Sequence, residues 1–186
     1  MNDVIFIRHA ETDMAGTFCG HSDPPINDRG RRQIQKLIGA LNGEAIECVY
    51  TSDLARAVST AEILSEAFGV PCIEKPNLRE IYFGSWEGLT WDQIQDKDED
   101  FARRWTEAYP NLPAQGGESF ADFQARVSSE VAGIFNDTDW RQAAVVTHGG
   151  VMRVVLQSMC GLAEKEAWEL TKPYCSFFKY SREVTR

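Results

Sequence analysis

The segment VIFIRHAET, residues 4–12, decides how the rest of the chain is interpreted. Its first four residues are apolar and mostly β-branched, which is typical of a parallel strand buried on both faces. They run directly into Arg8 and His9, a charged and titratable pair that is costly to hold beside a core. The rest of the sequence must therefore supply a reason for these two side chains to stand at the end of a buried strand.

Short apolar runs and amphipathic segments alternate along the chain. Further strands are expected at residues 48–51 (CVYT), 143–147 (AAVVT), 176–180 (SFFKY) and, on an edge because of its proline, 71–75. Helices are expected after Asn27 or Asp28, after Ser52 as an N-cap, from Ser119 onward, and over residues 151–159. This alternation predicts an α/β fold, a doubly wound, mostly parallel sheet with helices on both faces.

Residues 76–118 depart from this rhythm. They contain Trp86, Trp91 and Trp105, the acidic run DKDED at 96–100, and two prolines. Such a density of aromatic residues is not typical of a solvated linker. We therefore expect a single domain over residues 1–186, with a small helical lid or excursion at about 76–118 over one end of the sheet.

The composition limits the classes of partner. The 186-residue chain carries a net charge of −9, which argues against nucleic acid or an acidic membrane surface but does not exclude a small anion. Five scattered cysteines without a C-x-x-C pair are typical of reduced thiols. No apolar run is long enough to span a bilayer, and no leader segment is recognisable. A cytoplasmic location is expected.

Four side chains are predicted to meet at one edge of the sheet. In an open parallel sheet, ligands bind beyond the carboxyl ends of the strands. Arg8 and His9 follow the first strand, and His148 follows the strand at 143–147. Arg56 lies in the first turn of a helix, where a cation is unfavourable unless an anion is bound there. Each residue alone has an ordinary structural explanation, but together they predict a site for a dianionic oxyanion such as phosphate.

Four segments, in order, resemble the histidine phosphatase superfamily and its phosphoglycerate mutase-like branch. They are RHAET (8–12), SDLARAVSTAEIL (52–64), LREIYFGSWEG (78–88) and VTHGG (146–150). The acid phosphatase and phytase branch is disfavoured, because its R-H-G-x-R-x-P segment and its later H-D pair are absent. The resemblance implies a metal-independent phosphatase that forms a phosphohistidine and needs no cofactor.

The resemblance also implies roles for the matching residues. His9 would be the nucleophile, and Glu80 would protonate the leaving alkoxide and then activate water. The phosphoryl oxygens would be held by Arg8, Arg56, His148 and Gly149. Weaker candidates, for support of the site or contact with substrate, are Glu11, Thr12, Cys19, Gly20 and Trp86. A metal site is not expected, since the three histidines lack ligand spacing.

Two positions depart from the family pattern. Position 10 is alanine where glycine is usual, so the backbone there cannot need a conformation that only glycine allows. Ala15 stands where the family often places an asparagine that contacts phosphate. That donor is expected to be missing, or replaced by backbone amides near Gly16 or Gly20.

The resemblance leaves the substrate open, with a small phosphate monoester as the expected partner. The chain length, FGSWEG and residues 101–127 are most similar to α-ribazole phosphatases of cobalamin nucleotide-loop assembly, in which lid tryptophans would stack the base. A broad sugar or nucleotide phosphatase is one alternative. A phosphoglycerate mutase is another, with Arg103 and Arg104 holding a second anionic group, although a position on the outer face of a lid helix is favoured for this pair. A non-catalytic phospho-ligand binding module is disfavoured, because the nucleophile and the acid are both present. A homodimer remains open.

Overall fold

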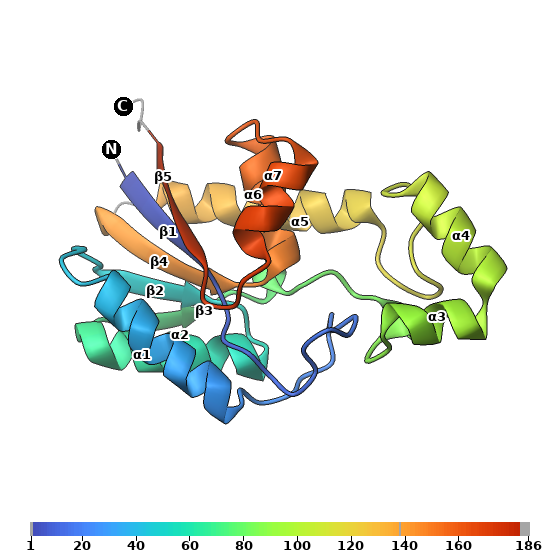
Figure 1. Ribbon diagram of the computed structural model, residues 1–186. Coiled ribbons are helices and arrows are strands. Elements are labelled where there is room, and N and C mark those ends of the chain that lie inside the picture. The colour runs from blue at the N-terminus through green and yellow to red at the C-terminus, as the bar shows by residue number, and fades with distance from the viewer. Residues whose placement is uncertain (1, 138, 183–186) are drawn as a thin grey trace.

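One five-stranded sheet organises the protein (Figure 1), which a computed structural model describes over residues 2–137 and 139–182. The strand order is β3-β2-β4-β1-β5, with bounds β1 Asn2–Arg8, β2 Cys48–Thr51, β3 Cys72–Glu74, β4 Gln142–Thr147 and β5 Phe177–Arg182. Strands β1 to β4 run parallel, and β5 pairs with β1 in the antiparallel sense. The predicted mostly parallel α/β sheet is confirmed.

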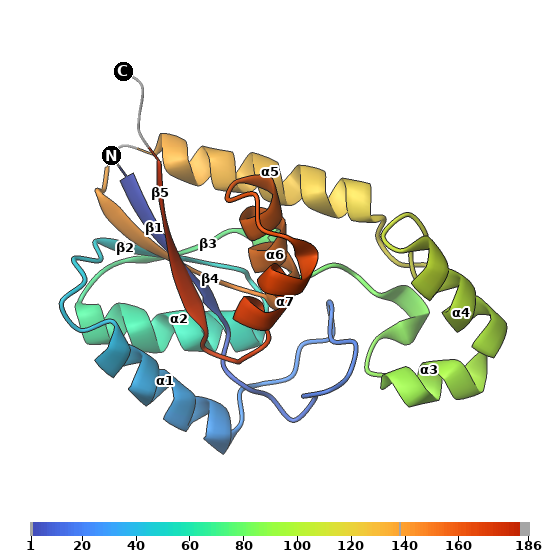
Figure 2. The same ribbon diagram turned by 45° about the horizontal axis from the view of Figure 1, so that its top comes forward.

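Helices cover both faces of this sheet (Figure 2). Their bounds are α1 Asp28–Ala40, α2 Ala55–Phe68, α5 Phe120–Asn136, α6 Gly149–Ser158 and α7 Glu164–Thr171. The apolar faces of α1 and α2 pack on one side of the sheet, and those of α5 and α6 on the other. No helix of the described part of the chain is long and apolar enough to cross a membrane.

Strand β1 contributes to both apolar layers. Val4 and Phe6 pack in the cluster with α5 and α6, whereas Ile5 and Ile7 pack in the cluster with α1 and α2. Successive side chains of a strand point to opposite faces, so an unbroken apolar run is what a strand covered on both faces requires. The polar residues that follow β1 therefore emerge at the edge of a closed core.

The helix starts were predicted with mixed success. Asn27 caps α1, since its side chain accepts a hydrogen bond from Gly30 N, and Ser119 accepts from Asp122 N at the start of α5. The expected cap at Ser52 is wrong, because α2 begins only at Ala55. Its first amide donates instead to Asp23 Oδ1 at 2.6 Å, from a distant loop. Helix α7 was not foreseen, and α6 begins two residues earlier than expected.

Residues 76–118 form the helical excursion, made of the short 3-10 turns η1 Pro76–Leu78 and η2 Gly84–Trp86 and the helices α3 Trp91–Lys97 and α4 Glu99–Ala108. In both views α3 and α4 project beyond the end of the sheet (Figures 1 and 2). The excursion has its own apolar core, in which Trp86 is 5% exposed. Phe18, from the loop after β1, packs edge-on against Phe83 and Trp86. The loop after β1 and the excursion are thus packed together.

Candidate active site

The carboxyl ends of β1, β2 and β4 bring together residues that are far apart in the sequence. Arg8, His9, Arg56 and His148 all lie at this edge, as the sequence predicts. The rings of His9 and His148 have their centroids 5.0 Å apart. Both imidazoles are buried, at 6% and 0% exposure, and Arg56 is 1% exposed. Two arginines and two histidines therefore share one buried site.

The tautomer of His9 follows from its two hydrogen bonds. Arg56 Nε lies 3.2 Å from His9 Nε2, and His9 Nδ1 lies 2.7 Å from the carbonyl oxygen of Ala10. A guanidinium can only donate, so Nε2 accepts and Nδ1 carries the proton that it donates to Ala10. Burial, and then the positive charges of Arg56 and Arg8, lower the pKa of His9 well below its usual value. The ring is therefore neutral, with a lone pair on Nε2.

The guanidinium of Arg56 is held by backbone carbonyls. It donates to the carbonyl oxygens of Ser22 at 2.6 Å, Gly20 at 2.7 Å and Cys19 at 3.2 Å. No carboxylate of the described residues forms an ion pair with it. Neutral acceptors satisfy its donors without cancelling its charge, so the site keeps a net positive character.

Arg8 is held in a comparable way from the other side. Its Nη1 donates to the carbonyl oxygens of Thr171, at 3.0 Å, and of Lys172, at the end of α7. Its guanidinium carbon lies 4.2 Å from the ring centroid of Tyr174, in a cation–π arrangement. The Tyr174 ring is also 5.6 Å from that of His9. The segment after α7 therefore covers one side of the site.

His148 is held by a residue that was expected to cap a helix. Its Nε2 lies 2.9 Å from Ser52 Oγ, across 96 residues of sequence. Its Nδ1 is buried and has no hydrogen-bond partner among the described residues, and the same is true of Arg8 Nε. Burial, and then the charge of Arg56, lower the pKa of His148 well below its usual value. A second neutral imidazole therefore faces the first.

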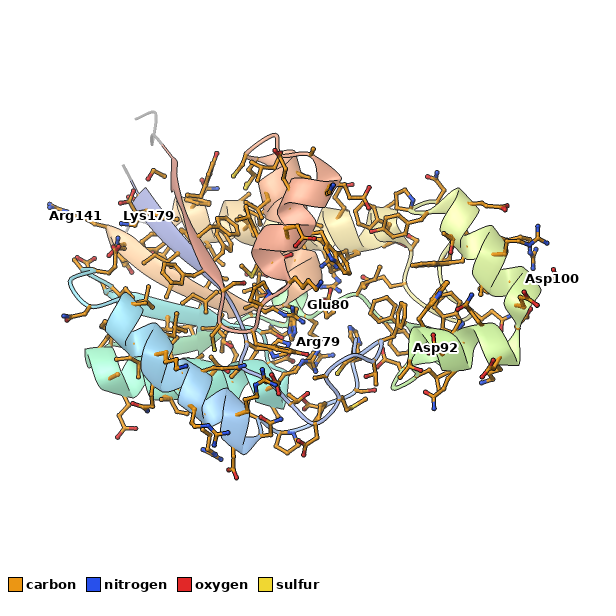
Figure 3. All side chains as sticks on the ribbon, viewed as in Figure 1. Arg79, Glu80, Asp92, Asp100, Arg141 and Lys179 are labelled. Atoms are coloured by element: carbon orange, nitrogen blue, oxygen red, sulfur yellow. The ribbon has the colours of Figure 1, made fainter. Side chains whose placement is uncertain are left out.

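Glu80 is anchored at the start of α6. Its Oε2 accepts from Gly150 N at 2.8 Å, and its Oε1 accepts from Ile81 N at 3.0 Å. A Cβ on Gly150 would stand 1.9 Å from Oε1, so glycine is needed for this approach. Arg126 donates to the carbonyl oxygens of Arg79 and Glu80, at 2.8 and 3.0 Å. Figure 3 shows Arg79 and Glu80 between the strand ends and the excursion.

Glu87 organises the loop that holds Arg56, a role that no pattern in the sequence indicates. Its carboxylate accepts from the amides of Gly20 (3.2 Å), His21 (3.0 Å) and Ser22 (2.8 Å), from the Ser22 hydroxyl (2.6 Å) and from Phe83 N (3.0 Å). Burial opposes its ionisation, but these bonds outweigh burial and lower the pKa of Glu87. The excursion therefore fixes the loop that positions Arg56.

Four of the weaker candidates lie in the loop after β1: Glu11, Thr12, Cys19 and Gly20. Cys19 acts through its carbonyl, and burial raises the pKa of its thiol. The amide of Gly20 is taken by Glu87, so it does not replace the missing asparagine at the exposed Ala15. Glu11 bonds Gln33 of α1. Thr12 is buried, and its hydroxyl accepts from Met14 N.

One expectation about the excursion needs correction, and the favoured position of Arg103 on the outer face of a helix is confirmed. Trp86 packs against Trp91, Phe101 and Trp105 in the core of the excursion, so it does not offer a face to a ligand. Arg103 has a side chain that is 62% exposed and pairs with Asp100 and Glu107 on its own helix. It therefore belongs to the outer surface of α4.

Several residues of the site carried no readable signal. Tyr174 stands outside every segment named from the sequence. Ser52, Glu87 and Arg126 stand inside such segments but touch partners that only folding brings near. Within the described residues, no three His, Cys, Asp or Glu side chains gather closely enough to hold a metal ion.

Replacing Glu87 by alanine is expected to lower the free energy of unfolding by about 2 kcal/mol at neutral pH, because loop donors lose their acceptor. Since the folded-state pKa of Glu87 is lowered, its contribution is present at neutral pH and is lost as the pH falls through that pKa. Urea denaturation of Glu87→Ala at neutral and acid pH measures both. The exposed Glu62→Ala on α2 is the control, and equal losses in the two variants would contradict the assignment.

Comparison with known proteins points the same way as the geometry. The family model of the histidine phosphatase superfamily (branch 1) matches residues 4–184. Phosphoserine phosphatase 1 of Hydrogenobacter thermophilus is 30% identical over 171 residues, which cover 90% of this chain and 81% of that protein. The adenosylcobalamin/alpha-ribazole phosphatase of Escherichia coli is 29% identical over 164 residues, which cover 87% of this chain and 81% of that protein.

A solved structure extends the similarity to the fold. The crystal structure of the alpha-ribazole phosphatase from Shigella flexneri matches with a TM-score of 0.85 at 25% identity, covering 95% of this chain and 89% of that one. The family model spans nearly the whole chain, and it includes every residue of the buried site. The chain therefore belongs to branch 1 of the histidine phosphatase superfamily.

Proposed function

We propose that this protein is a metal-independent phosphomonoesterase that passes the phosphoryl group of its substrate to His9 Nε2 and then to water. One observation carries most of the support. Arg8 Nε and His148 Nδ1 are buried in the site without hydrogen-bond partners among the described residues. Buried polar groups are nearly always satisfied in native proteins. The non-bridging oxygens of a bound phosphate ester would satisfy both.

The first half-reaction needs a neutral nucleophile and positively charged groups around the phosphate. His9 Nε2 attacks phosphorus as the bond to the ester oxygen breaks, so a phosphohistidine forms. The hydrogen bond from Nδ1 to Ala10 keeps the ring oriented and its proton off Nε2. Arg8, Arg56 and His148 stabilise the charge on the transferring group.

Proton transfer is assigned to Glu80. A departing alkoxide needs a proton, and the Glu80 carboxyl lies beside the first turn of α6, where it accepts from Gly150 N, two residues after His148. In the second half-reaction the carboxylate takes a proton from water, which attacks phosphorus and frees His9. The two bonds that Glu80 accepts from Gly150 and Ile81 keep its position constant between the two steps.

Two substrates follow from the relatives. α-Ribazole 5′-phosphate is proposed from the similarity to alpha-ribazole phosphatases. Phosphoserine is the second candidate, from the phosphoserine phosphatase at 30% identity, and the burial of Trp86 favours it by removing one face on which a base would stack. The exposed aromatic residues Tyr82 and Tyr109 remain available to either ester.

His9→Ala is expected to lower kcat on p-nitrophenyl phosphate by at least about 10³-fold, because no other group is placed to take the phosphoryl group. Circular dichroism checks that the variant is folded. The unaltered protein is expected to keep its rate in EDTA. A folded variant with a tenth of the original rate would remove His9 as nucleophile.

Glu80→Gln is expected to slow alkyl phosphates about 100-fold while slowing p-nitrophenyl phosphate only a few-fold, since nitrophenolate leaves without a proton. Single-turnover rates on the two esters give the ratio. Equal losses on both would assign Glu80 a purely structural role.

The substrate is tested by kcat/KM on a panel of α-ribazole 5′-phosphate, phosphoserine, mononucleotides and sugar phosphates. One ester at least about tenfold above the others identifies the substrate, since that is a discrimination worth about 1.4 kcal/mol. If kcat/KM is similar for all the esters, the protein is a broad phosphatase, and neither named substrate is its specific one.

A further inference from the structure

Besides Arg8 and Arg56, a third arginine stands at the edge of the site. Arg153 lies on α6, one turn after Gly149, and is half-buried. A Cβ placed on Gly149 would stand 3.3 Å from Arg153 Nη1 and 3.7 Å from Arg8 Nε. The two guanidinium groups therefore flank the same backbone position at the edge of the site.

The side chain of Arg153 has no polar partner in the described residues. No ion pair and no side-chain hydrogen bond of that part of the chain involves its guanidinium. It lies instead over the ring of Trp168, with its guanidinium carbon 4.6 Å from the centroid. This cation–π contact uses the face of the ring and none of the N–H donors of the guanidinium, and a carboxylate needs such donors for a bidentate contact.

The positive charge of Arg153 also acts on Tyr109, which follows α4 of the excursion. Tyr109, at the end of α4, is 42% exposed. Burial raises the pKa of its phenol, and the positive charge of Arg153 opposes that rise. Because Arg153 and Arg8 flank Gly149, an ester whose phosphate contacts Arg8 has Arg153 close to it.

Resting on the proposed phosphatase function, we infer that Arg153 forms a subsite for a carboxylate on the substrate, which makes carboxylate-bearing phosphate monoesters the preferred substrate class. Arg8, Arg56 and His148 already serve the phosphate dianion. A third guanidinium, which flanks the same glycine as Arg8, selects molecules that carry a further anionic group. The exposed Arg103 and Arg104 on α4 are not needed for this role.

The test compares 3-phosphoglycerate with glycerol 3-phosphate, which differ only by a carboxylate in place of a hydroxymethyl group. The unaltered protein should favour 3-phosphoglycerate at least about tenfold in kcat/KM, the value of one charge-assisted pair. Arg153→Gln should remove most of that preference by raising KM for 3-phosphoglycerate, and Arg153→Lys should restore part of it. Arg141→Gln removes the same charge from the opposite end of the sheet and should leave the preference intact (Figure 3).

A binding experiment separates this inference from the proposed chemistry. Calorimetry on folded His9→Ala measures the Kd of both esters without turnover. Tighter binding of 3-phosphoglycerate that disappears with Arg153→Gln supports the subsite. That support holds even if the unaltered protein is inactive on every ester, because inactivity contradicts only the proposed phosphatase function. A Kd ratio near one, or a ratio that survives Arg153→Gln, overturns the subsite. So does the absence of binding by either ester.

Discussion

The buried guanidinium of Arg56 is the interaction on which the rest of the site depends. It donates to His9 Nε2 and to three backbone carbonyls of the loop at residues 19–22. A cation at 1% exposure is costly unless its donors are satisfied, so the loop must turn its carbonyls inward. Glu87 makes that loop conformation stable by accepting its amides. The excursion is thereby tied to the nucleophile through one chain of hydrogen bonds.

This arrangement also explains how an acidic protein can hold an anion. The chain has a net charge of −9, yet at the strand ends the arginines are bonded to carbonyls rather than to carboxylates. Burial makes both histidines neutral, so the positive charge resides on guanidinium groups, which do not titrate near neutral pH. A neutral nucleophile beside permanent cations suits attack on a phosphate ester. Arg153, which has no ion-pair partner among the described residues, adds to this positive charge beside Gly149.

Local signals predicted much of the fold. The apolar runs of β1 and β4 and the caps Asn27 and Ser119 depend on neighbouring residues, and they appear as expected. Ser52 is not the cap of α2, because the helix begins only at Ala55, and its hydroxyl lies beside His148. Helix α7 gave a weak signal, since only Ala167 and Thr171 are buried along its eight residues and an apolar stripe is hardly visible.

The sequence by itself determined which reactive side chains stand at the strand ends: arginine and histidine after β1, histidine after β4, and arginine in the first turn of α2. Strand periodicity and the geometry of parallel sheets were enough for that. Only the tertiary structure decided what holds them. Arg8 bonds the carbonyl of Thr171, 163 residues away, and Arg56 bonds carbonyls more than 30 residues away. Every residue type carries the same carbonyl, so no sequence pattern marks such acceptors until folding brings them close.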